Sequence, residues 1–439
     1  MQVKDLKLEE EVLPFFDYTN SKYAADRLLS LLHEIPATEA EVLEKQTIIK
    51  GFLDNWAILE NFTYRKLDLM EVHASLGAIA NEYSAGGEGR LKFYLKLMLS
   101  ETERNRLRSR LVQIVLLLRS IYVQYLARLN KDKFPESFQK QLRNALTFLS
   151  KLDLNSHAEH INENRFTVLR IVAFAQRLIR LNPEEIKHFW DFFFFFEAYW
   201  SIAKGTLVKS FTFPSFSNGN FKIAGFYHPI LTNPVKNTLE MDEDQNVLLL
   251  TGPNMSGKST LLKAVSLCVY LARTGFTVPA SLCIIPFFSS IAIAVNLSDN
   301  LRDGYSHFMT EIANLKSVIH ATESSGKCFA VFDEIFRGTN VDDALDITQT
   351  TVNGLARIKK SFFLISTHML QLDGQLGRDT NMRIKKCYIE CILDNGSPKF
   401  SYHLKEGWSQ LKIGKILFEK EGLSELLRAK DILSKSNHT

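Results

Sequence analysis

The residues with the clearest chemical meaning form one short loop, Gly252–Ser259, within the stretch LLLTGPNMSGKST. The loop fits the spacing G-x-x-x-x-G-K-[ST], which binds nucleotide phosphates where a strand precedes it and a helix follows. Gly252 and Gly257 allow the backbone to curl so that its N–H groups face phosphate oxygens. Lys258 is expected to bridge the outer phosphates, and the Ser259 hydroxyl is expected to hold Mg²⁺. A purely structural Gly/Ser turn is the alternative, and the flanking apolar strand and amphipathic helix argue against it.

A pair of acids follows a second apolar run, CFAVF. At the end of that strand, Asp333 can hold Mg²⁺ and Glu334 can orient or deprotonate an attacking water. A third run, FFLIST, ends beside His368, which we expect to contact the γ-phosphate or that water. The alternatives are two solvated acids at a strand end and an ordinary surface histidine. The loop upstream favours the catalytic interpretation.

The elements that must position these residues differ between the two halves of the chain. From about residue 210 onward, short apolar runs alternate with helical segments, which is the pattern of a parallel sheet covered on both faces. Near the end, YIECIL and FSYHL flank Asp394, Asn395 and Gly396 and predict an antiparallel hairpin. We therefore predict an α/β P-loop domain over residues 208–439.

Residues 1–207 predict an all-α domain, because proline is rare and apolar residues recur every three or four positions. One helix is predicted to begin at Asn182 and Pro183, which suit a helix N-terminus. Because it carries the aromatic run FWDFFFFFEAYW around its whole circumference, we expect it to be buried. A stacking platform for bases is the less favoured alternative, since such platforms need exposed, spaced rings.

Composition indicates the class of protein. The 439 residues are 46% hydrophobic and 23% charged, with a net charge of +4, which suits a soluble chain of at least two cored units. The five cysteines lie mostly in apolar runs, as free thiols in a reducing compartment do. The N-terminal MQVKDLKLEEE is too charged for a signal peptide, and no stretch of membrane-spanning length lacks charge. We expect a cytoplasmic protein that does not interact with a membrane.

Taken in order, these motifs resemble the ATPase domain of the MutS family of DNA mismatch repair proteins. TGPNMSGKST resembles the family's phosphate loop, FDEIFRGTN its acidic strand and STH its switch histidine. The segments YHPIL, GFTVPAS, DNLRDGYSHFMTEI and EGWSQLKIGKILFEKEGLSELLRAKDIL follow the family's order as well, the last resembling its helical dimerisation region. The resemblance implies that residues 1–207 form the family's helical core, or lever, domain and that residues 208–439 form an ATPase domain of the ABC type. It also implies ATP and Mg²⁺ as cofactors. It implies ATP contacts from Gly252, Pro253, Asn254, Met255, Ser256, Gly257, Lys258, Ser259 and Thr260.

The first half is similar to the family more loosely and starts inside its core domain, at YAADRLLSLLHEIPATEAEVLEKQTIIKGFL. The resemblance thus predicts a truncated form that lacks the N-terminal mismatch-binding and connector domains. Phe195–Glu197 matches the letters of the mismatch wedge, but we interpret it as core. Between Gly89 and Asn182 we expect helices where the family has a strand-rich DNA clamp. Val235 stands where an adenine-stacking aromatic is common, and Phe336 stands where glycine is usual.

By the resemblance, the ATP site is composite. One subunit's loop would bind Mg-ATP, while Ser306 of the partner subunit would complete the site, with Gly304 allowing close approach. ATP would then join two ATPase domains until hydrolysis through Glu334 releases them. This implies a homodimer, or a heterodimer with a MutS-type subunit, acting in mismatch repair or recombination-related DNA transactions. The alternative is a nucleotide-dependent dimerising scaffold that signals to a protein partner without direct mismatch recognition.

For double-stranded or branched DNA, the best basic feature is the run ETERNRLRSRLV. On a helix, Arg104 and Arg108 share one face, as do Arg106 and Arg110, so that each row could neutralise phosphates. The preferred alternative is a solvated face with Glu–Arg pairs inside the helix. Because no mismatch reader is visible, DNA binding is expected to depend on shape and on salt.

Overall fold

The computed structural model describes residues 3–84, 95, 97–295, 307–336, 339–374, 376, 384–394, 397–409, 413–424 and 426–427. The chain divides into two compact units. The α/β unit comprises Met1–Pro14, Ile35–Glu39 and Lys209–Thr439, and the helical unit comprises Phe15–Glu34 and Ala40–Val208. Two short N-terminal segments therefore belong with the second half of the chain.

A six-stranded sheet forms the centre of the α/β unit. Its order is β10-β9-β4-β8-β7-β6, and every neighbouring pair is parallel except β10 with β9. The strands are β4 (Val247–Thr251), β6 (Ser290–Ala294), β7 (Cys328–Phe332), β8 (Phe362–Ser366), β9 (Ile384–Asp394) and β10 (Ser397–Glu406). The predicted apolar strands and the antiparallel pair near the end are confirmed. Because β4, β8 and β7 are parallel neighbours, their carboxyl ends share one edge of the sheet.

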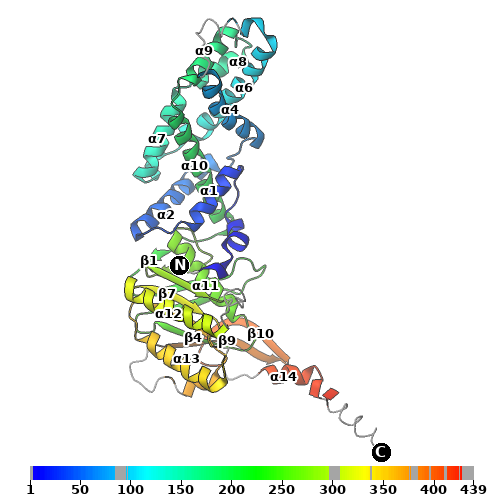
Figure 1. Ribbon diagram of the computed structural model, residues 1–439. Helices are drawn as coiled ribbons and strands as arrows, with labels where there is room; N and C mark the ends of the chain where they lie inside the picture. Colours follow the sequence, from blue (N-terminus) through cyan, green and yellow to red (C-terminus); the bar gives the residue numbers. More distant parts are fainter. Residues whose placement is uncertain are drawn as a thin grey trace, which may run out of the picture. The chain divides into compact units, whose positions relative to one another are not determined.

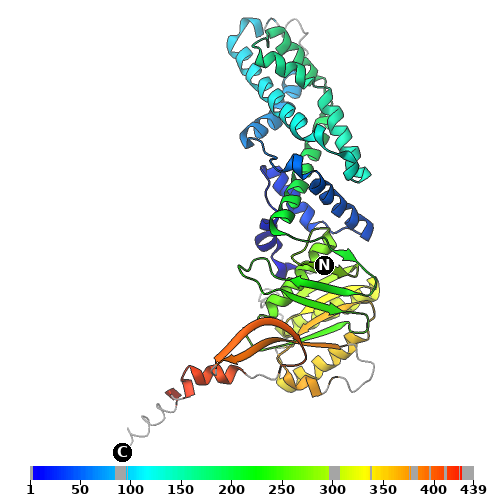
Figure 2. The same ribbon diagram turned by 180° about the vertical axis from the view of Figure 1, so that it is seen from behind.

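Other elements cover both faces of this sheet (Figures 1 and 2). Helices α12 (His307–Ser325) and α13 (Val341–Ala356) pack on one face, in a core that includes Val318 and Val352. The opposite face meets α11 (Lys258–Thr274) and a four-stranded sheet of order β1-β5-β2-β3. The strands of that sheet are β1 (Ser215–Phe216), β2 (Phe221–Phe226), β3 (Asn237–Met241) and β5 (Leu282–Ile285).

Short elements complete the α/β unit. They are the 3-10 helix η1 (Lys4–Leu6), the π-helix η2 (Leu8–Val12), the 3-10 helix η7 (Leu370–Gly374) and α14 (Ile413–Lys420). The 3-10 helix η3 (Leu13–Phe15) ends at the first residue of the helical unit. Leu6, Leu8 and Val12 are buried, so η1 and η2 are anchored to the rest of the unit by their apolar side chains.

The helical unit is built from α1 (Lys22–His33), α2 (Glu39–Asp54), α3 (Trp56–Leu59), α4 (Lys66–Ser84), α6 (Glu101–Ser120), η4 (Ile121–Tyr125), η5 (Leu126–Arg128), η6 (Lys131–Lys133), α7 (Glu136–Ser150), α8 (Leu154–Asn162), α9 (Val168–Ile179) and α10 (Pro183–Lys209). Residues 97–182 form helices and turns and no strand. Within the described chain, the run Glu101–Arg128 has the length and composition of a membrane span, a test that the core helix of a soluble protein also passes.

The aromatic helix α10 begins where the sequence predicts. The Asn182 side chain accepts a hydrogen bond from the backbone N–H of Glu184 at 2.9 Å. The rings of Phe193 and Phe196 are fully buried, and Trp200 Nε1 donates to the Leu59 carbonyl at 2.9 Å. The predicted burial is confirmed. These rings cannot form a base-stacking platform, because they already pack inside the helical unit.

A carboxylate lies inside this aromatic core. Glu197 is fully buried and accepts hydrogen bonds from the backbone N–H groups of Asn20 and Ser21 and from the hydroxyls of Ser21 and Tyr64. Burial raises the pKa of Glu197, and these hydrogen bonds oppose that shift. Since Ser21 also caps α1, Glu197 ties α10 to the start of α1. Glu197 is therefore a core residue, as predicted.

Two substitutions of Glu197 distinguish two effects on the free energy of unfolding: the loss of hydrogen-bond acceptors and the removal of a buried charge. Glu197→Leu should destabilise the helical unit by about 3 kcal/mol or more, because several buried donors lose their acceptor. Glu197→Gln should cost less than about 1.5 kcal/mol at pH 7, since it keeps an acceptor and removes the charge. Tryptophan fluorescence during urea unfolding would measure both, because three of the four tryptophans lie in this unit.

The same pair of proteins gives a pH test. The pKa of Glu197 in the folded state is raised above its ordinary value of 4.5. The contribution of Glu197 to the free energy of unfolding is therefore complete below pH 4.5 and is lost as the pH rises through the raised pKa. The parent should therefore lose stability relative to Glu197→Gln as pH is raised from 4.5 to 8. If the difference in unfolding free energy between the two proteins stays constant from pH 4.5 to 8, the pKa of Glu197 is not raised in the folded state.

Candidate functional site

The loop Gly252–Gly257 joins β4 to α11 and curls as its glycines predict. Gly252 has φ +147° and Gly257 has φ +95°, conformations that side chains rarely adopt. A Cβ at Gly252 would lie 3.0 Å from Ser256 Oγ, so the turn also requires a small residue. The loop is thus a tight strand-to-helix turn that opens α11, the geometry expected for holding phosphates at a helix N-terminus.

Lys258, the first residue of α11, turns its ammonium back into this loop. Its Nζ donates to the carbonyls of Gly252 at 3.0 Å and Pro253 at 3.2 Å and lies 3.8 Å from Glu334 Oε1. Burial lowers the pKa of Lys258, and the nearby carboxylates of Glu334 and Asp333 act in the opposite direction. The ammonium therefore lies between the loop and the acidic strand end.

Two hydroxyls of the loop differ in their surroundings. Ser256 is fully buried, and its Oγ has no hydrogen-bond partner within the described residues. A buried hydroxyl without a partner inside a phosphate-type loop fits a site for an oxyanion, because such a group is costly to leave unsatisfied. Ser259 is exposed at the start of α11, where its oxygen can reach a metal ion.

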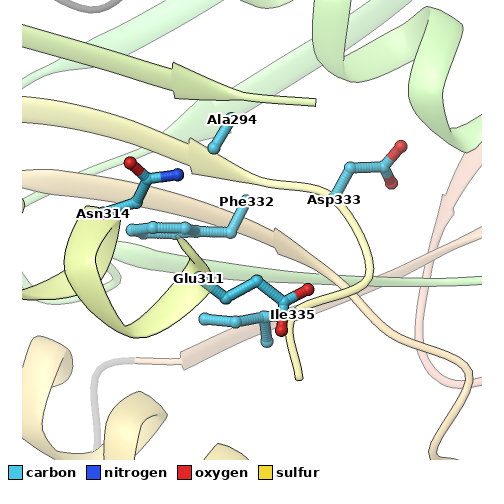
Figure 3. Close-up of a pocket in the computed structure, with 6 residues that line it drawn as sticks. All are labelled: Ala294, Glu311, Asn314, Phe332, Asp333 and Ile335. Carbon is cyan, nitrogen blue, oxygen red and sulfur yellow. The ribbon is translucent and has the colours of Figure 1, made fainter. Parts of the chain in front are cut away.

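The acidic turn, Asp333–Phe336, follows β7 and is held through its backbone N–H groups. Asp333 N–H donates to the Ala294 carbonyl at 3.0 Å, on the neighbouring strand β6. Glu334 N–H donates to Ser366 Oγ at 2.8 Å, and the Ser366 hydroxyl in turn donates to the Asp333 carboxylate. Ser366, the last residue of β8, thus orients both acids. Figure 3 shows the Asp333 carboxylate pointing away from the other labelled side chains.

Two residues of the acidic turn have backbone angles that favour glycine. Glu334 has φ +57° and Phe336 has φ +66°. The structure accommodates Phe336 by burying its ring beside that of Phe308, with 6.0 Å between the ring centroids. The Phe336 N–H donates to Glu311 Oε2 at 2.9 Å. These contacts hold a backbone conformation that is strained for phenylalanine.

The charged side chains converge at the carboxyl edge of the sheet. His368, just beyond β8, contacts Glu334 Oε1 through its Nε2, and that same carboxylate oxygen lies near Lys258. The neighbouring Thr367 N–H donates to the Leu250 carbonyl at 3.0 Å, which joins the ends of β8 and β4. Lys258, Asp333, Glu334 and His368 therefore form one cluster, although they come from distant parts of the chain.

Tyr402 belongs to the same site and was not predicted from the sequence. It lies in a bulge of β10, between Phe400 and Leu404, and its ring carbon is 3.2 Å from the position of a Cβ on Gly257. The Tyr402 side chain is 46% exposed. Asn237 fixes the bulge, donating to the Tyr402 carbonyl at 3.0 Å and accepting from Leu404 N–H at 2.8 Å. The sequence shows an aromatic ring within FSYHL. It does not show that this ring lies beside the phosphate-type loop, because that position depends on the bulge.

The four arginines of α6 divide into two kinds. Arg104 and Arg110 are partly buried: Arg104 donates to the Leu97 carbonyl at 3.4 Å, and Arg110 donates to Ser75 Oγ at 3.3 Å. Arg106 and Arg108 are exposed. The exposed pair is therefore the better candidate for phosphate contact. The predicted Gly304 and Ser306 lie outside the described residues.

Comparisons with known proteins match the same part of the chain. The family model of MutS domain V matches residues 248–435. The DNA mismatch repair protein MutS of Geobacillus sp. (strain WCH70) is 30% identical over 244 residues, 53% of this chain and 28% of that protein. That of Bacillus subtilis is 30% identical over 243 residues, 53% of this chain and 27% of that protein.

A eukaryotic relative extends the matched region. MutS protein homolog 4 of Mus musculus is 29% identical over 303 residues, 65% of this chain and 31% of that protein. The matched part of the chain spans less than a third of the length of each of these curated relatives. The family model covers the phosphate-type loop, the acidic turn and His368 together, so residues 248–435 are similar to domain V of the MutS family.

Proposed function

We propose that the α/β unit is a P-loop ATPase domain of the ABC type, and that it couples ATP binding and hydrolysis to closure of a dimer on DNA. The observation that carries the proposal is the cluster of Lys258, Asp333, Glu334 and His368 at one sheet edge. An ammonium, two carboxylates and an imidazole beside a glycine-bounded loop suit phosphoryl transfer to water. The match of residues 248–435 to MutS domain V supports the same proposal.

Each residue of the cluster has a role that its contacts suit. Lys258 exchanges its carbonyl partners for the β- and γ-phosphate oxygens of ATP. Glu334 accepts a proton from the attacking water, and His368, in contact with its carboxylate, holds it in orientation. Asp333 and Ser259 would hold Mg²⁺ together with the phosphates, a donor set typical of nucleotide sites. When bound, that ion supplies neutralisation of the phosphate charge.

The partner in this mechanism is a second MutS-type subunit, either identical or related. We propose that Ser306 of the partner subunit completes the site around the γ-phosphate, so that ATP stabilises the closed dimer and hydrolysis releases it. The relatives' names support a role in mismatch repair or a related DNA transaction. Duplex or branched DNA is the proposed ligand, with Arg106 and Arg108 as candidate phosphate contacts.

Two substitutions test the chemistry. Lys258→Ala should abolish ATP binding, because the ammonium that faces the phosphates is lost. Glu334→Gln should bind ATP with Mg²⁺ normally, lower the rate of hydrolysis by about 10²–10⁴-fold and accumulate a closed dimer. Radiolabelled ATP retention, phosphate release and light scattering would measure the three effects.

The matched control is Asp346→Asn, which removes an exposed carboxylate from α13, and it should behave like the parent. Hydrolysis by Glu334→Gln at the parent rate would refute the role assigned to Glu334. If the folded parent neither retains nor hydrolyses ATP in the presence of Mg²⁺, the proposed function is wrong.

Tyr402 is proposed to stack on the adenine in place of the aromatic that Val235 replaces. Tyr402→Ala should weaken ATP binding about fivefold or more, because stacking of a base on an aromatic ring contributes about 1–3 kcal/mol. The rate at saturating ATP should not change, and Tyr402→Phe should bind as the parent does. Fluorescent ATP titration gives the affinities; equal affinities for all three proteins would exclude stacking at this ring.

A salt titration distinguishes DNA binding from a scaffold role. Arg106→Ala and Arg108→Ala are tested separately, because these two side chains lie on different faces of α6. The substitution that removes a phosphate contact should weaken duplex or junction binding and reduce the slope of log K against log salt by about 0.9. Lys140→Ala with Arg143→Ala, an exposed basic pair on α7, is the matched control and should keep the parent slope. If the parent does not bind DNA at low salt, with or without ATP, the scaffold function is favoured.

A further inference from the structure

We infer that Asp5, in the N-terminal 3-10 helix η1, is a positioning residue for the Mg²⁺-binding side of the ATP site. This inference rests on the proposed ATPase function, because it assigns Asp5 an effect on Asp333. Asp5 does not touch the phosphate-type loop in any contact described above. Its influence passes through one peptide group at the end of β6.

The contact is a pair of hydrogen bonds on the two sides of a single peptide. Asp5 Oδ2 accepts a hydrogen bond from Val295 N–H at 2.8 Å. The carbonyl of that same peptide unit belongs to Ala294, and it accepts the Asp333 N–H at 3.0 Å. The peptide unit between residues 294 and 295 therefore links the carboxylate of Asp5 to the backbone of Asp333 through two hydrogen bonds. Figure 3 shows Ala294 and Asp333 at the ends of neighbouring strands.

Hydrogen bonds arranged in this order strengthen one another. A carboxylate that accepts from the N–H polarises the peptide and makes its carbonyl a better acceptor. The Asp5 charge thus stabilises the hydrogen bond that fixes where the acidic turn leaves β7. Asp333 is the first residue of that turn, so a small shift of its backbone moves the carboxylate proposed to hold Mg²⁺.

The N-terminal segment is anchored well enough to act in this way. Leu6, Leu8 and Val12 are buried at 3%, 6% and 1% exposure, and η1 contacts both α11 and β6. The segment Met1–Pro14 belongs to the same compact unit as the sheet. Asp5 is therefore held against the end of β6 by the buried apolar residues that follow it in the chain.

The acidic turn is a place where such support matters. Glu334 and Phe336 have positive φ angles, and a strained turn persists when the surrounding contacts over-determine it. The Asp333, Glu334 and Phe336 N–H groups are held by Ala294, Ser366 and Glu311 respectively. Asp5 reinforces the first of these three contacts, at the residue that would bind the metal ion.

The test compares Asp5→Leu, Asp5→Asn and a matched control in the full chain. Asp5→Leu removes the acceptor, whereas Asp5→Asn keeps a side-chain oxygen that can accept from Val295. Glu10→Leu removes an exposed carboxylate from the same segment and serves as the control. The readouts are the Mg²⁺ concentration that gives half-maximal ATP hydrolysis at saturating ATP, ATP binding without Mg²⁺, and hydrogen exchange of the Asp333 amide.

Asp5→Leu should raise the half-maximal Mg²⁺ concentration at least about threefold, the scale expected for the loss of one hydrogen bond. It should also speed exchange at Asp333 by a similar factor and leave ATP binding without Mg²⁺ unchanged. Asp5→Asn should restore most of the parent behaviour, and Glu10→Leu should match the parent. A merely structural role would lower the rate without changing the Mg²⁺ requirement.

Each other outcome decides against the inference or against its premise. Unchanged exchange at Asp333 in Asp5→Leu overturns the inference, whatever the activity. Faster exchange with an unchanged Mg²⁺ requirement reduces Asp5 to a structural contact and also overturns it. A parent chain that neither binds nor hydrolyses ATP refutes the proposed function instead, and the exchange measurement then still decides whether Asp5 supports the acidic turn.

Discussion

The candidate site depends on one buried ammonium and its three partners. Lys258 follows β4 and Glu334 follows β7, and the strand between them in the sheet is β8. The side chains therefore meet above the end of β8. The last residue of β8, Ser366, bonds the Asp333 carboxylate, and His368, just beyond the strand, contacts the Glu334 carboxylate. A desolvated ammonium is costly unless it is hydrogen-bonded and paired. The curled loop satisfies it with two carbonyls, and Glu334 supplies the opposite charge.

The same arrangement explains how a strained turn can be kept at the strand end. Positive φ angles at non-glycine residues cost roughly 1–3 kcal/mol each, and Glu334 and Phe336 both have them. Three backbone N–H groups in the turn have fixed acceptors, and the Phe336 ring is buried. Phe336 therefore keeps a backbone conformation that favours glycine, because packing and hydrogen bonding act on the same residue.

Local patterns in the sequence predict the parts of this site that lie within one strand and its following turn. The spacing in Gly252–Ser259 and the acids after CFAVF are such patterns, and the apolar runs predict β4, β7 and β8. Ser366 was not predicted, because its contact with Asp333 depends on the register of two strands, in which Phe332 pairs with Ile365. Asp5 was not predicted either, because Val295 lies 290 residues away and no local pattern encodes that pairing.

Tyr402 shows why an edge strand can supply a residue that local patterns do not predict. Inserting a bulge into a central strand would break hydrogen bonds on two sides, whereas β10 has a neighbour on one side only in the six-stranded sheet. The bulge re-aims the Tyr402 ring towards Gly257, and Asn237 from β3 bonds the backbone that the bulge displaces. Val235, where an aromatic was expected, lies two residues before Asn237. The short segment in which an aromatic was expected thus leads directly into Asn237, which fixes the Tyr402 ring beside the loop.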